Sequence, residues 1–197
     1  MNNNLSDILT IKAPEVSLEH VLDNSKAASG GENDVNFLKY LIANNLIVMG
    51  EAVLKRSTED INEEYYYGKY KKSHDESGRH FLCRAIIQDE LQRLGLGTYP
   101  ITEAGNMQIL RESSIYDIVT SDFKTIIDVG FTSARNYIRG LTDLRVQNYL
   151  ITTYFDDYIR DIIFTTFSRK DDQQFLNAVK DYVESGNVPG AQNGMLS

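Results

Sequence analysis

Apolar residues recur at intervals of three and four along residues 34–56, the spacing at which side chains share one face of a helix. Asn33-Asp34 precedes this run and is a good N-cap pair. The pattern therefore predicts a helix over about 34–56, and its broad apolar surface is a candidate homodimer interface. The apolar positions are Val35, Leu38, Leu41, Ile42, Val48, Met49 and Val53.

A second helix is predicted from Ser73 or Asp75 to about Leu94. Gly95-Leu96-Gly97 follows it and supplies the left-handed stop that commonly ends a helix. Glu90 lies on the apolar stripe of this helix, and His80 lies near the same side. A half-buried histidine on the helix surface is the favoured interpretation of His80, with a catalytic role as the alternative. The stripe consists of Cys83, Ile87, Leu91 and Leu94.

From residue 98 the period of the pattern changes from helical to alternating, which is typical of strands. Ser121-Asp122 is a plausible hairpin turn, Thr132-Ser133 caps a third helix over about 133–147, and a last helix runs from Asp171 to Gly186. A hairpin is antiparallel and a helical crossover favours a parallel return, so the sheet should be mixed. The predicted strands are 98–103, 108–112, 115–120, 123–131, 149–155 and 162–168.

The fold class expected from this order is α/β (α+β), with a mixed central β-sheet flanked by helices. Residues 1–33 contain the breaker-rich Gly30-Gly31 and are interpreted as a flexible N-terminal arm. Residues 34–72 are expected to form a helical extension, 73–186 the core domain, and 187–197 a disordered tail.

Composition limits the location and the partners. The chain is 42% hydrophobic and 24% charged, and its net charge of −8 argues against non-specific binding to polyanions. One cysteine rules out a disulfide framework, and no segment is apolar enough to span a bilayer. A cytoplasmic location without a membrane partner is therefore expected.

Two carboxylates in the predicted hairpin are candidates for chemistry. A loop at Ser121-Asp122 pairs residue 119 with 124 and 117 with 126, which places Asp117, Lys124 and Asp128 on one face. The two aspartates are then diagonal neighbours, about 7–8 Å apart at the backbone. A buried pair of carboxylates is costly, and Mg²⁺ or Mn²⁺ would relieve the cost. The alternative is a strand aspartate at an exposed edge or paired with an arginine.

An acidic helix residue followed by a hairpin with an acid on each strand resembles the PD-(D/E)XK nuclease superfamily over residues 73–169. The resemblance implies a restriction-endonuclease-like core of a helix, a three-stranded meander, a second helix and a further strand. Glu90 matches the helix carboxylate of that family, Tyr116-Asp117 the Pro-Asp position, and Asp128-Val129-Gly130 the (D/E)-x-K position. All three acids would then act at a Mg²⁺ or Mn²⁺ site.

Gly130 departs from the family pattern, because the family's lysine is thought to activate water and stabilise charge on the phosphate. Lys124, or Arg135 and Arg139 on the following helix, are the candidate replacements, and each has the alternative of a solvated cation. The helix that begins at Thr132-Ser133 could receive a backbone phosphate at its free N–H groups, although both residues are equally suited to simple N-capping.

These residues predict a metal-dependent endonuclease that hydrolyses DNA phosphodiester bonds, with DNA favoured over RNA as the partner. One alternative is a catalytically inactive nuclease fold that serves as a binding or assembly module, which Gly130 and the negative charge favour. Another is an unrelated α+β interaction domain whose carboxylates are incidental.

Overall fold

The computed structural model describes residues 5–12, 17–22, 31–56, 61–100, 117–130, 133–155 and 161–189. The described helices are α1 Leu5–Ile8, α2 Leu18–Val21, α4 Glu32–Ala43, α5 Glu63–Lys69, α6 Gly78–Arg93, α8 Ala134–Thr142 and α9 Asp172–Ser185. The described strands are β1 Thr10–Lys12, β2 Ile47–Lys55, β3 Thr98–Pro100, β4 Ile118–Thr120, β5 Thr125–Asp128, β6 Asn148–Phe155 and β7 Asp161–Arg169.

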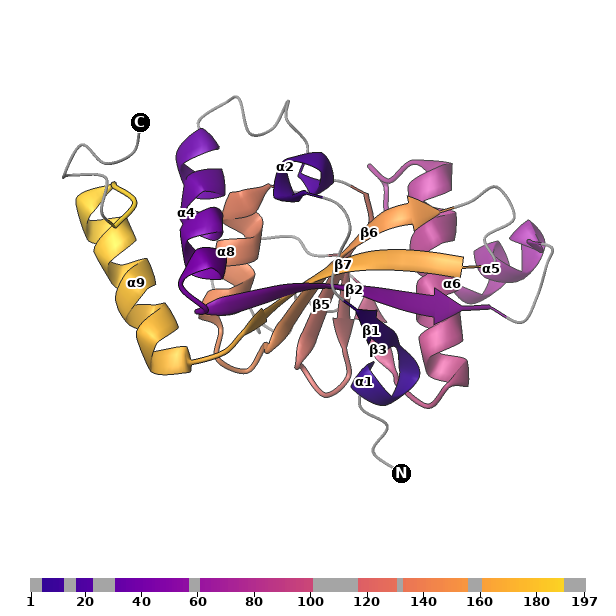
Figure 1. Cartoon of the computed structure of the whole chain (residues 1–197). Coiled ribbons are helices and arrows are strands. Elements are labelled where there is room, and N and C mark those ends of the chain that lie inside the picture. The colour runs from indigo at the N-terminus through magenta and orange to yellow at the C-terminus, as the bar shows by residue number, and fades with distance from the viewer. Residues whose placement is uncertain are drawn as a thin grey trace.

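The strands form one open sheet in the order β1-β2-β7-β6-β5-β4-β3, with helices on both of its faces (Figure 1). Strands β5 and β6 are parallel. The other neighbouring strands in the described sheet pair antiparallel. The predicted class, an α/β protein with a mixed central sheet flanked by helices, is therefore confirmed. No helix among the described residues has the length and apolar character needed to cross a membrane.

Two hydrophobic cores lie on opposite faces of the sheet. Helices α2, α4, α8 and α9 cover one face and bury Val119 and Ile126. Helices α1, α5 and α6 cover the other face and bury Ile118 and Ile127. Because side chains alternate along a strand and both faces are covered, every residue of β5 is buried. The carboxyl end of β5 thus reaches the boundary between two packed layers.

The helix predicted over 34–56 ends at Ala43, so the prediction is wrong for residues 44–56. Asn45 adopts a left-handed φ of 56° and ends the helical path. Residues 47–55 then form β2, which pairs with β7 along its whole length. Their burial alternates with a period of two, and the apolar residues among them also fitted a helical spacing. The segment expected to be a helical extension therefore supplies a strand of the main sheet.

The apolar face of α4 is buried against the same chain. Phe37, Leu38 and Leu41 have no exposed surface and belong to the core beneath α8 and α9. Their burial removes the surface on which the predicted dimer interface depended. The N-terminal arm contributes β1, which pairs with the outer edge of β2.

Other predicted boundaries held better. Helix α6 lies within the predicted segment and is capped by Ser77, whose side chain accepts from the His80 amide. Helix α9 begins after Asp171 and ends at Gly186, as predicted, with Gly186 in the left-handed conformation that favours glycine. Helix α8 is shorter than predicted and ends at Thr142. The predicted strand 108–112 and residues 190–197 of the predicted tail lie outside the described residues.

Candidate active site: a carboxylate pair between two layers

The β4–β5 hairpin has a register two residues away from the predicted one. Ile118 pairs with Ile127 and Val119 with Ile126, which places Asp117 directly opposite Asp128 and not diagonal to it. A shift of two residues preserves the face on which each side chain lies. The prediction that the two aspartates share a face is therefore correct, while the predicted pairing of residue 117 with 126 is wrong.

The turn between the strands explains this register. Asp122 accepts hydrogen bonds from the Thr120 hydroxyl at 2.7 Å and from the Lys124 amide at 3.0 Å. Phe123 takes a left-handed φ of 61°, and its amide donates to the Thr120 carbonyl. The chain therefore needs a longer connection than the two residues expected, and Lys124 lies in the turn and not on the strand.

Backbone amides cross-link the two carboxylates. The Asp117 amide donates to Oδ1 of Asp128 at 3.1 Å, and the Val129 amide donates to Oδ2 of Asp117 at 2.7 Å. The Tyr149 hydroxyl, from β6, donates to Oδ2 of Asp128. Each carboxylate is thus fixed by a donor from the neighbouring strand, which holds the pair in one geometry.

Burial makes Asp128 hard to ionise. Its pKa is raised to about 7, first because burial removes water from the carboxylate and second because the charge of Asp117 lies close by. The hydrogen bonds from Tyr149 and from the Asp117 amide lower the pKa, but they only partly offset these two effects. The pair therefore resists carrying two negative charges.

His80 connects Asp117 to helix α6. Its Nε2 lies 3.1 Å from Oδ2 of Asp117, and its Nδ1 lies 2.6 Å from Oε1 of Glu76. The hydrogen bond to Asp117 is the largest cause of a rise in the His80 pKa to about 9. At neutral pH the ring is an imidazolium that donates to both carboxylates. The predicted position, half-buried on the helix, is correct, but the contact with Asp117 was not foreseen.

Glu76 is held in turn by Arg84, a fully buried residue one turn beyond His80. Arg84 donates through Nε to Oε1 of Glu76 at 2.8 Å and through Nη2 to Oε2 at 2.9 Å. Burial opposes the charge of Glu76, but the hydrogen bonds from Arg84 and others outweigh burial and keep its pKa at about 2. We call this connected set the carboxylate network: Arg84, Glu76, His80, Asp117, Asp128 and Tyr149.

Glu90 does not join this network among the described residues. It is buried on α6, as its stripe position predicted, but it pairs with Arg93 at 2.7 Å and with Arg56 at 3.8 Å. Glu90 lies ten residues beyond His80, which is roughly 15 Å along a helix. The residues of α6 that reach the strand ends come from its first turns, and a stripe pattern does not reveal the level along the helix.

The predicted basic residues are also placed away from the pair. Lys124 is exposed in the turn, four residues before Asp128, a distance of roughly 13 Å along a strand. Arg135 pairs with Asp34 of α4 at 3.3 Å, and Arg139 is exposed on α8. Gly130 is exposed and has a φ of 83°. Helix α8 nevertheless begins only a few residues after Asp128.

The two predicted phosphate-binding residues at the start of α8 differ in what can be said of them. Ser133 is the N-cap of α8 and accepts from the Asn136 amide at 3.3 Å. Its hydroxyl therefore performs the capping role that was the alternative to binding phosphate. Thr132 lies outside the described residues.

The chemistry of the carboxylate pair suits a small divalent cation only in part. Among the described residues, no group of three or more histidine, cysteine or acidic side chains is arranged to hold a metal ion. Mg²⁺ is commonly bound through one or two carboxylates, with water and substrate phosphate oxygens completing its shell. Asp117 and Asp128 supply that minimum, and Oδ1 of Asp117 accepts no hydrogen bond from the described part of the chain.

Comparisons of the chain with protein-family models, with curated proteins and with solved structures found no match. The function must therefore be argued from the site alone.

Proposed function

We propose that the chain is a nuclease that uses Mg²⁺ or Mn²⁺ to hydrolyse phosphodiester bonds in DNA at Asp117 and Asp128. The observation that carries the proposal is the direct opposition of these two carboxylates at the buried ends of β4 and β5. The raised pKa of Asp128 indicates that its ionised form is disfavoured, and a nearby positive charge would stabilise that form. A divalent cation would supply that charge.

The order of elements supports the same proposal. Helix α6 is followed by the antiparallel strands β3, β4 and β5, then by α8, and then by β6 parallel to β5. This is the order of helix, three-stranded meander, helix and strand that the sequence resemblance implied.

In this proposal Asp117 and Asp128 hold the cation, which when bound lowers the pKa of a water molecule and screens charge on the phosphate. Tyr149 fixes Asp128 by its hydrogen bond, and His80 fixes Asp117. Among the described residues, His80 is the basic side chain that contacts the pair, but both of its ring nitrogens are already engaged, by Asp117 and Glu76, so it does not act on water or phosphate as was expected of Lys124, Arg135 or Arg139. It is a positioning residue, held by Glu76 on its far side.

A catalytically inactive nuclease fold that binds a partner is the second candidate. It is favoured by Gly130, which has no side chain to act on a phosphate, and by the hydrogen bonds that already occupy three of the four oxygens of the pair. A network satisfied by the protein itself is what a structural role requires.

Cleavage of plasmid, linear duplex, branched and single-stranded DNA, and of RNA, in Mg²⁺, Mn²⁺ or EDTA tests the proposal. We expect cation-dependent cleavage of DNA that Asp117→Asn and Asp128→Asn abolish. Asp181→Asn, an exposed change on α9 with the same loss of charge, is the matched control and should leave cleavage unchanged. Cations should also raise the melting temperature of the wild type more than that of either site variant.

Each remaining outcome has a definite meaning. A cation-dependent rise in melting temperature without cleavage of any substrate would favour the inactive module. If no cation changes the melting temperature and no substrate is cut, the carboxylate pair is not a metal site and the proposal fails.

A further inference from the structure

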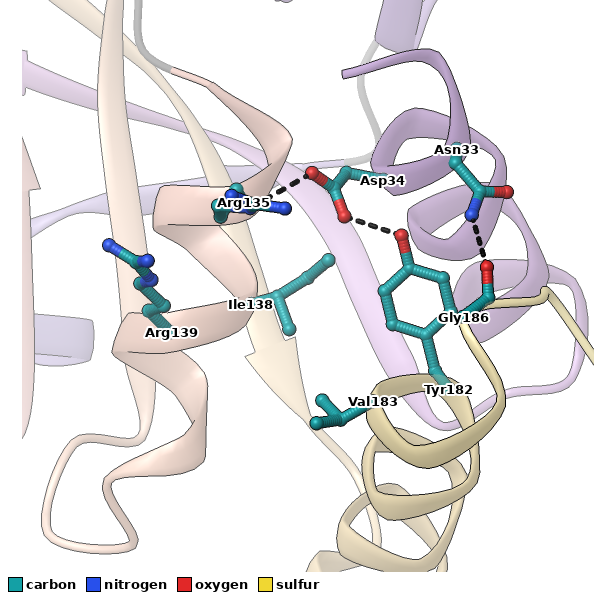
Figure 2. Close-up of a pocket in the computed structure, with 8 residues that line it drawn as sticks. All are labelled: Asn33, Asp34, Arg135, Ile138, Arg139, Tyr182, Val183 and Gly186. Carbon is teal, nitrogen blue, oxygen red and sulfur yellow. Dashed lines mark hydrogen bonds and ion pairs between the residues drawn. The ribbon is translucent and has the colours of Figure 1, made fainter. Parts of the chain in front are cut away.

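A pocket of about 480 Å³ lies between α4, α8 and α9, three of the helices that cover one face of the sheet. Figure 2 shows its walls: Asp34 from α4, Arg135, Ile138 and Arg139 from α8, and Tyr182 and Val183 from α9. None of these residues belongs to the carboxylate network. A volume of this size is within the range of pockets that bind small molecules, about 300–1,000 Å³.

Asp34 is the one acidic residue among the described residues that line the pocket, and its charge is neutralised within the wall. Asp34 is almost fully buried and accepts a hydrogen bond from the Tyr182 hydroxyl through Oδ1. Its Oδ2 lies 3.3 Å from Nε of Arg135. Asn33 donates to the carbonyl of Gly186 at 2.7 Å and ties α4 to the end of α9 (Figure 2). Hydrogen bonds and an ion pair within the chain thus connect α4 to both α8 and α9.

Two arginines leave positive charge at the pocket after Asp34 is neutralised. The side chain of Arg135 is 63% exposed although its Nε faces Asp34. The guanidinium of Arg139, one turn further along α8, makes no hydrogen bond or ion pair with the described part of the chain. Among the described residues that line the pocket, two cations against one anion give a net charge of about +1, on a chain whose net charge is −8. A local excess of this sign attracts anions to this place.

The rest of the lining is apolar and partly rigid. The ring of Tyr182 stacks on Phe37 with centroids 4.1 Å apart, so its position is fixed. Ile138 and Val183 project into the space between α8 and α9 (Figure 2). Val183 is 72% exposed, the largest value among the exposed hydrophobic residues of the described chain. An apolar ligand body in contact with Val183 would remove that surface from water.

We infer that this pocket binds an oxyanion, a phosphate or a carboxylate, carried on a small apolar body. The planar guanidinium groups of Arg135 and Arg139 match the oxygens of either anion, and such pairs can be bidentate. The apolar body would lie against Ile138, Tyr182 and Val183. The pocket is separate from Asp117 and Asp128, so this inference stands whether or not the chain is a nuclease.

Binding of small probes to the full chain in EDTA tests the inference without involving a metal. The probes are phenyl phosphate, benzoate, inorganic phosphate and the neutral benzyl alcohol, and the readout is the shift of amide resonances in a titration. We expect saturable binding of phenyl phosphate or benzoate, weaker binding of inorganic phosphate, and none of benzyl alcohol. The tighter of the two aromatic anions shows which oxyanion, phosphate or carboxylate, the pocket prefers.

Three variants test whether the charges that line the pocket control the binding of the anions. Arg139→Gln should weaken anion binding about tenfold, the loss of one charge-assisted contact. Lys180→Gln removes the same charge from α9 at a residue that does not line the pocket, and it should have no effect. Asp34→Asn should tighten binding, because it removes the negative charge and releases the guanidinium of Arg135.

Opposite effects of Arg139→Gln and Asp34→Asn would not arise from general loss of structure. If Asp34→Asn fails to fold, as a melting curve would reveal, the comparison of Arg139→Gln with Lys180→Gln decides the matter. The inference is overturned if neither aromatic anion binds saturably, or if Arg139→Gln and Lys180→Gln bind equally well.

Discussion

Replacing Asp128 by asparagine should change how the stability of the protein depends on pH. The wild-type carboxyl has a pKa of about 7 in the folded protein, against 3.8 for the free group, because burial and the charge of Asp117 disfavour ionisation. The folded state therefore holds this proton more tightly than the unfolded chain does. The stabilisation is fully present below about pH 4 and is lost as the pH rises through 7.

The size of the effect follows from that shift. As the pH rises from 5 to 9, ionisation of Asp128 should lower the free energy of unfolding by on the order of 2–3 kcal/mol. Asparagine is neutral at every pH and lacks this dependence. At pH 5 the variant should be less stable than the wild type by about 1–3 kcal/mol, because the amide places a donor where Asp128 has an acceptor. At pH 9 the deficit should disappear or change sign.

Urea unfolding followed by circular dichroism at pH 5, 7 and 9 measures this difference. His80 also loses a stabilising proton between its unfolded pKa of 6.5 and its folded pKa of about 9, but its main partner is Asp117, so the loss occurs in both proteins and is removed on subtraction. The exposed change Asp181→Asn is the control and should keep a constant difference. Parallel stability curves for Asp128→Asn and the wild type would refute the assignment of a buried, proton-holding carboxyl.

Other changes near the network have defined outcomes. In Gly140→Ala a new Cβ would lie 2.6 Å from the ring of the buried Tyr149, which should cost about 1–3 kcal/mol in thermal unfolding, whereas Gly68→Ala meets no atom within 4 Å and should be harmless. Arg84→Met removes the two guanidinium hydrogen bonds to the buried Glu76 and leaves His80 as its remaining charged partner; it should cost about 3–5 kcal/mol in urea unfolding, part of which the added change Glu76→Gln should restore. Because the folded pKa of Glu76 is about 2 against 4.5 for the free group, wild-type stability should fall between pH 4.5 and 2, and an acid titration of Glu76→Gln should show a shallower fall.

The elements whose period was unambiguous were predictable from sequence. Helix α9 shows both of its caps in the sequence, and the strands β6 and β7 were expected almost within their bounds. The failure over residues 44–56 has a specific cause. Its apolar residues fit two periods, and the deciding feature is the left-handed Asn45. Asparagine is, after glycine, a common residue at a left-handed helix end, so Asn44-Asn45 was a signal that the apolar pattern outweighed. Strand β2 is also stabilised by β7, more than a hundred residues away.

The candidate site was predictable only where it depended on local alternation. Asp117 and Asp128 share a face because their parity along the two strands survives any even shift of register. Their exact opposition depended on the Asp122 turn, which the sequence did not reveal. His80 and Glu76 lie four residues apart and could have been proposed as a pair on the predicted helix, although Glu76 precedes the N-cap Ser77 in the structure. Nothing in the sequence indicated that the first turn of α6, and not the turn carrying Glu90, reaches the strand ends.

The carboxylate network joins the two layers of the protein at one point of the sheet. Arg84, Glu76 and His80 belong to the layer of α6, whereas Tyr149 packs edge-on against Tyr137 of α8 at 4.1 Å between ring centroids. The opposition of Asp117 and Asp128 is the link between these groups. Tyr137 is fully buried, and its pKa is raised well above the usual value by burial and by the charge of Asp128.

The charges of the aspartate pair therefore shift the pKa of His80 on one side of the sheet and of Tyr137 on the other. A packed interior gives no reason to place an ionisable pair at such a junction, because apolar residues of similar volume would fill it at lower cost. The proposed metal chemistry would give such a reason, because His80 of α6 and Tyr149 of β6 hold the two carboxylates at the strand ends.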